Sequence, residues 1–379
     1  MIDALIAGAG PAGSIAALVL ARAGARVLLV DRDRFPRDKL CGDTLNPGAV
    51  RLLSSLGLTG GALNRARALQ GMIVSGPRVS VVAKYEPAAV GLAIRRTDLD
   101  AWLLDEAIRA GAHFEDHVVV KRPVLEHIAG GRQIVRGLVL ARRGHNTEVR
   151  MPAGMTIAAD GRRSVVARAL GLTYHPKKPR RWAFGVYASN VAGVGDLGEM
   201  HVRNGCYIGV AGMPDGLTNI CLVTSSMGPF RKPVDLIRDA LARDPMLAER
   251  TRAMAFETSV RVLGPLAVEA RAAGAAGLLL AGDAGGFVDP MTGDGLRLAM
   301  ESAVLAANEV RSVLEHGHIM TAADRFADVR RISIGGKTRF NRMVRRLVDM
   351  PMGLEVAEAG ARLWPGLVRR AARYAGDVM

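Results

Sequence analysis

The sequence predicts an α/β fold with a second, mainly antiparallel sheet and a helical C-terminus. Two short apolar runs, residues 2–7 and 26–30, flank an Ala- and Leu-rich stretch at 11–23, as in a strand–helix–strand unit of a parallel sheet. Between residues 180 and 264, short strand-like segments such as WAFGVYAS and CYIGVAG alternate with Gly, Pro and Asp turns, which favours antiparallel strands. The chain beyond residue 294 is mostly helical in pattern and basic.

The elements of the first sheet can be justified in chain order. Residues 2–7 (IDALIA) and 26–30 (RVLLV) are almost continuously apolar, which is typical of strands buried on both faces. Residues 98–110 have apolar side chains at helical spacing, with Asp98 as a candidate N-cap. Residues 277–281 (GLLLA) predict a further buried strand, which leads through a Gly-rich turn into a long helix at 294–315.

Composition limits the classes of function. The chain has 379 residues, 49% of them hydrophobic, which is enough for two closely joined domains with a large core. The net charge of +15 is spread along the chain and aromatic residues are few, so we expect no nucleic-acid partner. The three cysteines have neither disulfide nor metal-ligand spacing, so we expect no metal site and a reducing, cytoplasmic setting. No apolar run is long enough to span a bilayer; peripheral membrane contact stays open, and we expect a monomer or homodimer.

A nucleotide-binding fingerprint follows the first strand. Residues 8–13 (GAGPAG) fit G-x-G-x-x-G between a strand and a helix, the context that such a motif requires. Gly8 permits the tight turn, Gly10 lets the backbone approach a pyrophosphate, and Gly13 allows close helix–strand packing. Asp31 ends the second strand, where an acid accepts a hydrogen bond from the adenosine ribose. These features predict a Rossmann-type domain.

Three later segments resemble motifs of one large flavoprotein group. They are Arg96-Thr97-Asp98-Leu99 with Leu103, then Asp160-Gly161, and finally Gly282-Asp283 followed by Pro290 and Gly293-Asp294-Gly295. Over residues 1–315 the chain resembles the group that includes p-hydroxybenzoate hydroxylase, the geranylgeranyl reductases and the flavin-dependent halogenases. The resemblance implies FAD as cofactor, with Arg96 near its pyrophosphate, Asp283 on its ribityl chain, and the N–H groups at 293–295 facing the isoalloxazine ring.

The candidate FAD contacts combine the fingerprint with these motifs. They are Gly8, Gly10, Pro11, Ala12, Gly13, Asp31, Arg32, Cys41, Arg96, Asp160, Gly282, Asp283, Pro290, Gly293, Gly295 and Leu296. The implied domain order alternates along the chain. We expect the FAD-binding domain in residues 1–70, 96–175 and 265–320, the antiparallel-sheet substrate domain in 71–95 and 176–264, and C-terminal helices in 321–379.

The resemblance is closer to the geranylgeranyl reductases. Residues 36–43 (PRDKLCGD) look like that branch's loop, in which a Cys-Gly pair approaches the flavin, and residues 283–290 also match it. Cys41 is either an inert buried thiol or a residue that shapes the flavin pocket. Together with Tyr207 and Pro290 it is a candidate for lining the catalytic pocket. Where that branch has an aromatic Y-x-W-x-F-P segment, residues 207–214 (YIGVAGMP) carry small side chains, and the halogenase W-x-W-x-I-P segment is absent.

Three functions fit these features. The first is oxygenation or another oxidoreduction of an apolar aromatic or polyketide-like metabolite, which the small residues at 208–212 favour. The second is reduction of isoprenoid C=C bonds, which the Cys41 loop and residues 283–290 favour. The third is electron transfer without small-molecule turnover. NAD(P)H or another external reductant would bind transiently, because no second G-x-G-x-x-G is present.

Two further features have alternative interpretations. His201 lies on a predicted second-domain strand and is either structural or faces the substrate. Residues 337–348 have apolar side chains at helical spacing among arginines. This stretch is either an amphipathic helix packed on the domain or a basic surface helix that meets anionic lipid.

Overall fold

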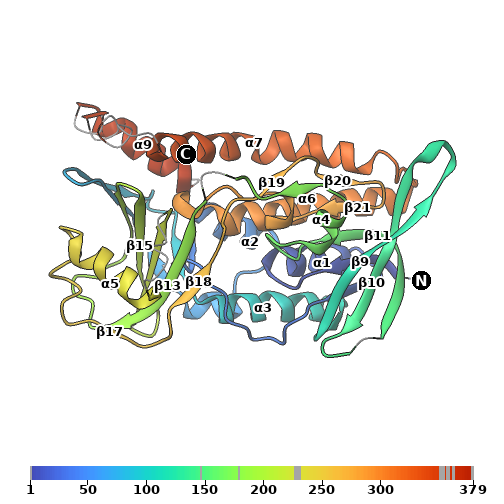
Figure 1. Ribbon diagram of the computed structural model, residues 1–379, viewed down its shortest axis with the longest axis horizontal. Helices are drawn as coiled ribbons and strands as arrows, with labels where there is room; N and C mark the ends of the chain where they lie inside the picture. The colour runs from blue at the N-terminus through green and yellow to red at the C-terminus, as the bar shows by residue number, and fades with distance from the viewer. Residues whose placement is uncertain are drawn as a thin grey trace.

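Two eight-stranded sheets organise the computed structural model, which describes residues 2–145, 147–177, 180–225, 232–349, 355, 359–360 and 363–376. The sheets lie towards opposite ends of the long axis, and a long C-terminal helix runs over both of them (Figure 1). This arrangement confirms the predicted fold class. It also confirms the helical C-terminus within the described residues.

The first sheet has a parallel core in the order β20-β21-β11-β1-β2-β8, to which an antiparallel ribbon of β10 and β9 is joined at β11. Its strands are β1 (Ile2–Ala7), β2 (Val27–Val30), β8 (His113–Glu115), β9 (Val118–His127), β10 (Gln133–Arg142), β11 (Glu148–Ala158), β20 (Gly274–Ala275) and β21 (Leu278–Leu280). At its edge β20 pairs antiparallel with β21, as β10 does with β11. The predicted strands at 2–7, 26–30 and 277–281 are therefore present with small differences in their ends.

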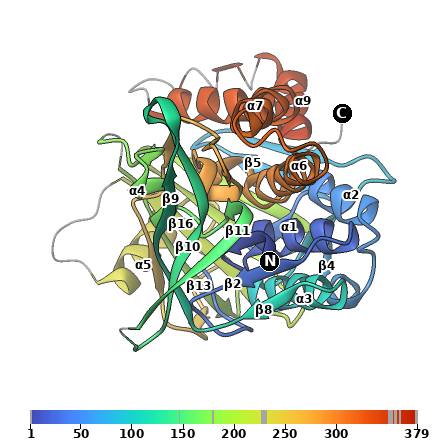
Figure 2. The same ribbon diagram turned by 90° about the vertical axis from the view of Figure 1, so that its right-hand side faces the viewer.

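Both faces of this parallel core are covered, which explains its unbroken apolar runs. On one face lie α1 (Pro11–Arg22), α3 (Arg96–Arg109) and α6 (Gly295–His316), packed against Ile6, Leu29 and Ile157. On the other face, the β9–β10 ribbon and α4 (Val165–Ala169) cover Leu5 and Leu28. Figure 2 shows the helices and the ribbon on opposite sides of the sheet.

The start of α3 differs from the prediction. Asp98 is not the N-cap: the helix begins at Arg96, with Arg95 at the N-cap, and Asp98 lies in the first turn. The guanidinium of Arg96 donates two hydrogen bonds to Asp100, one turn further on, and this pair stabilises a helix that already includes Arg96. The acid at 98 still suits its position, since a carboxylate in the first turn interacts favourably with the helix dipole.

The second sheet has the order β17-β13-β16-β15-β14-β5-β6, with β18 also paired to β13. Its strands are β5 (Gly71–Ser75), β6 (Ser80–Lys84), β13 (Trp182–Ser189), β14 (Leu197–Arg203), β15 (Cys206–Gly212), β16 (Thr218–Thr224), β17 (Ala255–Phe256) and β18 (Arg261–Leu263). All pairs are antiparallel except β14 with β5. Helix α5 (Pro233–Arg243) packs on the outer face through Ile237 and Leu241, which leaves the inner face for the flavin side.

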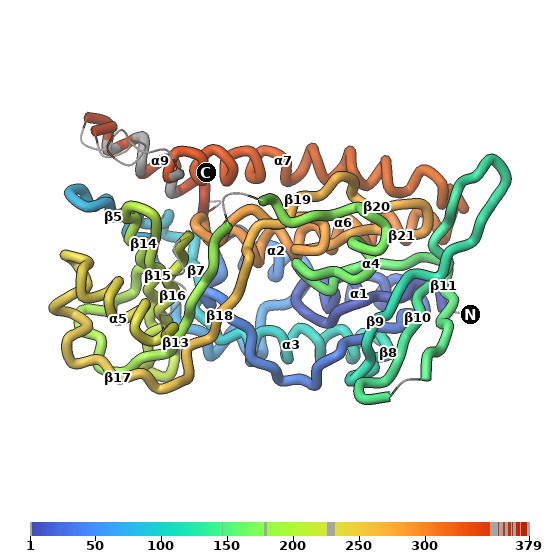
Figure 3. Tube along the Cα trace, viewed as in Figure 1, coloured from blue at the N-terminus to red at the C-terminus, as the bar shows by residue number. Residues whose placement is uncertain are grey.

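Smaller elements connect the two sheets. They are β3 (Thr44–Leu45), β4 (Arg67–Leu69) and β7 (Gly91–Ala93) in one small sheet, β12 (Thr173–Tyr174) paired with β19 (Glu269–Ala270), and helix α2 (Pro47–Ser55). Helices α7 (Ala322–Asp349) and α9 (Pro365–Gly376) follow α6. Figure 3 shows α7 lying along α6 and reaching the second sheet. No helix of the described residues is long and apolar enough to cross a membrane.

Candidate cofactor and substrate site

The turn after β1 is fixed by two glycines and left open by a third. Gly8 has a φ of +95°, and a Cβ there would lie 2.6 Å from the Ala159 carbonyl oxygen. A Cβ on Gly13 would lie 1.7 Å from the Gly8 carbonyl oxygen, so α1 can approach the strand only with glycine at 13. A Cβ on Gly10 would meet only the Arg37 guanidinium, at 3.3 Å. Gly10 therefore faces only the end of a flexible side chain, and its backbone lines the pocket, as a backbone that contacts a ligand must.

Two helix N-termini border the same pocket. α1 starts after Gly10 and α6 starts after Asp294, and neither has a side-chain cap. Gly10, Pro11 and Ala12 line the pocket on one side, and Gly295 and Leu296 line it on another. Uncapped helix N-termini offer free N–H groups and a positive dipole end, so the pocket suits a ligand with negative charge at more than one place.

Basic side chains add to this positive character. Arg96 and Lys39 line the pocket, and Arg37 lies against Gly10. Asp100, fully buried, accepts two hydrogen bonds from Arg96 at 2.6 and 2.7 Å and lies 3.4 Å from Arg37. Burial and the repulsion of Arg96 lower the pKa of Lys39. Burial opposes the charge of Arg96 too, but Asp100 outweighs it and raises the pKa of this guanidinium. These three cations face two carboxylates, Asp100 and Asp283, which leaves net positive charge for an anionic group.

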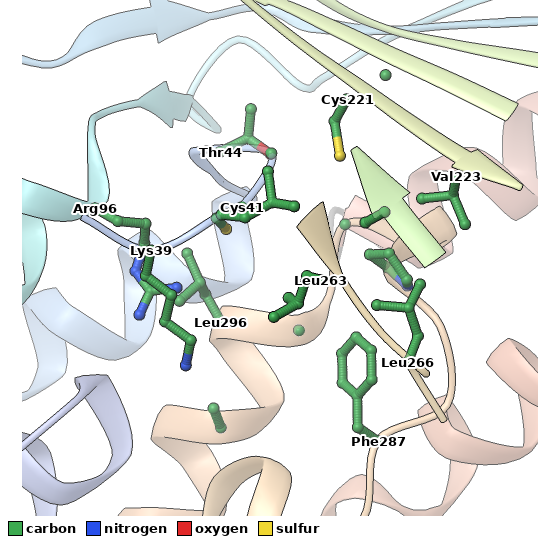
Figure 4. A pocket seen from close by; sticks show the side chains of 18 of the residues that line it. Lys39, Cys41, Thr44, Arg96, Cys221, Val223, Leu263, Leu266, Phe287 and Leu296 are labelled. Carbon is green, nitrogen blue, oxygen red and sulfur yellow. The ribbon is translucent and has the colours of Figure 1, made fainter. Parts of the chain in front are cut away.

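The other end of the pocket is apolar. Figure 4 shows Lys39 and Arg96 on one side and Val223, Leu266 and Phe287 on the other, with Cys41 and Leu296 between. The second sheet contributes its inner face through β15 and β16, where Gly209, Val210 and Ala211 leave a shallow, small-residue surface. A Cβ on Gly209 would meet nothing closer than 3.9 Å. The small residues noted in the sequence therefore do widen this pocket.

The sequence-predicted contacts divide into those that line the pocket and those behind it. Lining residues are Gly10, Pro11, Ala12, Cys41, Arg96, Gly282, Asp283, Pro290, Gly293, Gly295 and Leu296. Five candidates, Gly8, Gly13, Asp31, Arg32 and Asp160, are not among the lining residues. Gly8 and Gly13 act by shaping the turn.

The three polar residues behind the pocket have partners within the protein. The Asp31 carboxylate accepts hydrogen bonds from Ala9 N at 2.7 Å and Asp33 N at 2.9 Å, so it holds the glycine turn in place. Arg32 is exposed beside Asp33. Asp160 accepts a hydrogen bond from Val165 N at 3.0 Å at the start of α4, and burial raises the pKa of its carboxyl. Asp31 and Asp160 thus hold turns that bear lining residues, whereas Arg32 is a surface residue.

The candidates for the catalytic pocket lie where the flavin side meets the second sheet. Cys41 lines the pocket, and burial raises the pKa of its thiol, so the sulfur stays protonated at neutral pH. Tyr207 is 2% exposed and donates a hydrogen bond to Asp289 Oδ1 at 2.5 Å. Asp289 also lies 3.2 Å from Arg181 and bonds Met291 N, next to Pro290. Tyr207 and Pro290 are thus held by a common carboxylate.

His201 does not face the pocket. Its fully buried ring lies between Ser75 Oγ and Glu199 Oε2, each at 2.8 Å, and Glu199 is held in turn by Arg250. This chain of polar groups joins β5 to β14 and the segment around residue 250, which supports the structural interpretation. In contrast, the sequence analysis overlooked Arg37, Lys39 and Arg162. Lys39 and Arg162 line the pocket. The basic run after β2 was the signal that could have indicated the first two.

The geometry fits FAD: an open glycine turn, two uncapped helix ends, surplus cations and an adjoining apolar surface. The family described as FAD binding domain matches residues 1–208. The chain belongs to this family. Reductase-named relatives accompany this match, and the protein is an FAD-dependent oxidoreductase.

Several of the relatives are named as reductases. The chain is 30% identical to menaquinone reductase of Mycolicibacterium smegmatis, over 82% of this chain and 76% of that protein. It is 31% identical to menaquinone reductase of Mycobacterium tuberculosis, over 80% and 75%. It is 27% identical to digeranylgeranylglycerophospholipid reductase of Methanosarcina mazei, over 84% and 77%.

Solved structures share the fold. A geranylgeranyl bacteriochlorophyll reductase-like protein from Thermoplasma acidophilum matches with a TM-score of 0.80 at 20% identity, covering 100% of this chain and 99% of that one. A flavin-dependent brominase matches with a TM-score of 0.81 at 18% identity, covering 99% and 93%. At these identities the likeness concerns the fold alone.

Proposed function

We propose that this enzyme uses FAD to reduce a carbon–carbon double bond in a long apolar substrate, such as the prenyl chain of a quinone or glycerolipid. The sequence analysis placed oxygenation of an aromatic or polyketide-like metabolite first and C=C reduction second. The names of the relatives, menaquinone reductase and digeranylgeranylglycerophospholipid reductase, support the reverse order.

The observation that carries the proposal is a second apolar pocket that adjoins the flavin pocket. The two share Thr44, Met72, Met200 and Gly293 as lining residues. The second pocket extends between the inner face of β5 and β14 and the C-terminal helices, with Val74 and Val202 on one wall and Val344 and Leu347 of α7 on the other. A compact aromatic metabolite needs only the first pocket, whereas a prenyl chain would fill both and bury apolar surface along its length.

Different residues of the pocket would bind the cofactor, stabilise charge at its ring and exclude water. Bound FAD, once reduced by an external donor, would supply a hydride to one carbon of the double bond, and a proton from solvent would complete the other. Lys39 and Arg96, with the α1 N-terminus, would hold its diphosphate, and the N–H groups of Gly295 and Leu296 would stabilise negative charge at the ring. The apolar residues Leu263, Leu266 and Phe287 would exclude water from the reacting bond. Cys41, protonated and partly buried, would pack beside the ring.

The test is anaerobic turnover of chemically reduced enzyme with a menaquinone that carries a full prenyl chain. We expect a product that has gained two hydrogen atoms in the chain, detected by mass spectrometry. The proposal is wrong if the prenyl substrate is unchanged while oxygenated product forms from an aromatic compound in air. That outcome would restore the first hypothesis of the sequence analysis.

A matched pair of variants tests the second pocket. Val344→Trp would place an indole ring in the pocket, because Val344 lines it. Val329→Trp adds the same bulk at an exposed position of the same helix. We expect Val344→Trp to lower kcat/KM for the long-chain substrate by about 10-fold or more, and Val329→Trp to leave it unchanged. Equal effects of the two variants would remove the support that this pocket gives.

A further inference from the structure

An arginine-lined pocket lies between α7 and the segment from Val268 to Asp289. It borders the flavin pocket, because Gly282, Asp283, Phe287 and Gly295 contribute to the lining of both. Its basic residues are Arg271, Arg330, Arg331, Arg339 and Arg342. Neither the flavin site nor the apolar substrate path described above uses these side chains.

Arg330 is fixed at the wall that the pocket shares with the flavin turn. Its Nη2 donates a hydrogen bond to the Gly285 carbonyl oxygen at 2.7 Å. A Cβ on Gly285 would lie 2.8 Å from Nη1, so the guanidinium lies directly against the backbone of the turn. Within the part of the chain that the structure describes, no carboxylate forms an ion pair with Arg330. Burial and the neighbouring Arg342 lower the pKa of Arg330 to about 10, as expected for a cation that lacks a counter-charge.

The surrounding charges do not neutralise the pocket. Arg342 lies 3.1 Å from Glu269, and Arg331 lies 3.2 Å from Asp328 on the solvent side. Arg271 lies over the Tyr174 ring, 5.2 Å from its centre. Arg339 is exposed and lines the pocket as well.

The two nearby carboxylates either already have partners or also line the flavin pocket. Asp289 is held by Arg181 and Tyr207, and Asp283 belongs to both pockets. Positive charge therefore exceeds negative charge around Arg330, and a buried guanidinium without an anion is costly.

We propose that this pocket binds the phosphoryl group of a second ligand, distinct from FAD. Guanidinium groups match the planar, bidentate geometry of phosphate oxygens, and Arg330, Arg339 and Arg342 of α7 all line this one pocket. The diphosphate of FAD has its own cations, Lys39 and Arg96, on the other side of the shared turn. The phosphoryl group belongs to a soluble nucleotide or to a lipid headgroup.

The experiment measures pyrophosphate binding to flavin-saturated protein by calorimetry at constant ionic strength. We expect saturable binding that Arg330→Ala weakens at least about tenfold. Arg311→Ala, which removes an exposed charge from α6 near Glu315, is the control and should bind as the wild type does. No binding to the wild type, or equal affinity in Arg330→Ala, would overturn the proposal.

Two further variants guard against a purely structural effect of Arg330. Arg339→Ala should also weaken binding, because Arg339 lines the pocket, and its exposed side chain makes a structural effect small. Glu269→Gln releases Arg342 from its carboxylate and should tighten binding, which loss of structure could not do. If Glu269→Gln weakens binding instead, the electrostatic argument fails.

Competition identifies the source of the phosphoryl group. Displacement of pyrophosphate by NADPH indicates a nucleotide, and displacement by phosphatidylglycerol vesicles but not phosphatidylcholine vesicles indicates a lipid headgroup. Either result supports the site. Displacement by neither would overturn the proposal, because inorganic pyrophosphate alone would then be the ligand. The readout is binding and does not depend on turnover of any prenyl substrate.

Discussion

At one end of the flavin pocket, the turns at 8–13 and 293–295 present backbone N–H groups, and Lys39 and Arg96 add positive charge. At the other end, β15 and β16 present the side chains of small or apolar residues. The first end is defined by the backbone and is closely packed from behind. The second is defined by which side chains happen to point inwards from a sheet. Substitutions should therefore be tolerated very differently at the two ends.

The space around two glycines shows how differently the two ends tolerate an added side chain. At Gly13 an added Cβ would lie 1.7 Å from a carbonyl oxygen, whereas at Gly209 the nearest atom would be 3.9 Å away. The flavin end can therefore accept almost no change, while the substrate end can be remodelled without disturbing the fold. This difference suits a family in which one cofactor serves many substrates.

The largest effect is expected from Gly13→Ala. The methyl group cannot fit against the Gly8 carbonyl, so α1 must move away from β1 and the glycine turn must open. We expect a loss of at least about 3 kcal/mol in the free energy of unfolding, with flavin absent from the purified protein. Gly195→Ala is the control, because nothing lies within 4 Å of its Cβ. A yellow Gly13→Ala protein of wild-type stability would contradict the packing argument.

Arg96→Met should have the next largest effect. It removes a cation from the pocket and leaves the fully buried Asp100 with only Arg37 at 3.4 Å. We expect a loss of about 3–5 kcal/mol in stability and about 100-fold weaker FAD binding, measured by denaturation and by flavin titration. In Arg96→Met/Asp100→Asn the buried charge is gone, so stability should recover while FAD binding stays weak. Recovery of both would mean that Arg96 acts on the fold alone.

The same contrast explains what the sequence could predict. The glycine turn, the parallel strands and the uncapped start of α6 follow from local rules, because glycine spacing and apolar runs dictate backbone shape within a few residues. The strand at 182–189 could also be predicted from its alternation and turns. The parallel pairing of β5 with β14 could not, because Gly71 lies opposite Leu197, far away in the chain.

Side-chain environments were less predictable than backbone. His201 is a buried link between Ser75 and Glu199, and Arg250 holds Glu199; this depends on three segments that meet only in the folded chain. Asp98 is not the N-cap because the helix begins two residues earlier. Arg96 and Asp100, which are hydrogen-bonded one turn apart, favour this earlier start. Lys39 looked like one basic residue in a polar loop, and only its position beside Arg96 identifies it as part of the pocket.

The buried Asp43 carboxyl links the loop after β2 to the second sheet, and it should make the stability of the protein depend on pH. It is 1% exposed and accepts hydrogen bonds from Tyr187 and Asn219 of the second sheet, yet burial raises its pKa from 3.8 to about 6. Because the folded pKa is the higher one, the stabilisation from this carboxyl is complete below about pH 4 and is lost as pH rises through 6. Relative to Asp43→Asn, wild-type stability should therefore fall by about 2–3 kcal/mol between pH 4 and 7.

Urea denaturation of the two proteins across this range checks the prediction, and Asp98→Asn, exposed on α3, should follow the wild-type curve. Parallel curves for the wild type and Asp43→Asn would show that the Asp43 carboxyl ionises as easily in the folded protein as in the unfolded chain.

The smallest expected effect is at the substrate end. Gly209→Phe places a ring on the inner face of β15, where the nearest atoms leave room for a Cβ, and its bulk then projects into the apolar part of the pocket. We expect an unchanged flavin content, a change in stability below about 1 kcal/mol, and a rise of about 10-fold in KM for bulky substrates, with less effect on small ones. Flavin titration and steady-state kinetics with substrates of increasing size measure these effects separately. A variant that loses FAD would show that the two ends are coupled, and that the tolerance argued for the second sheet does not hold at β15.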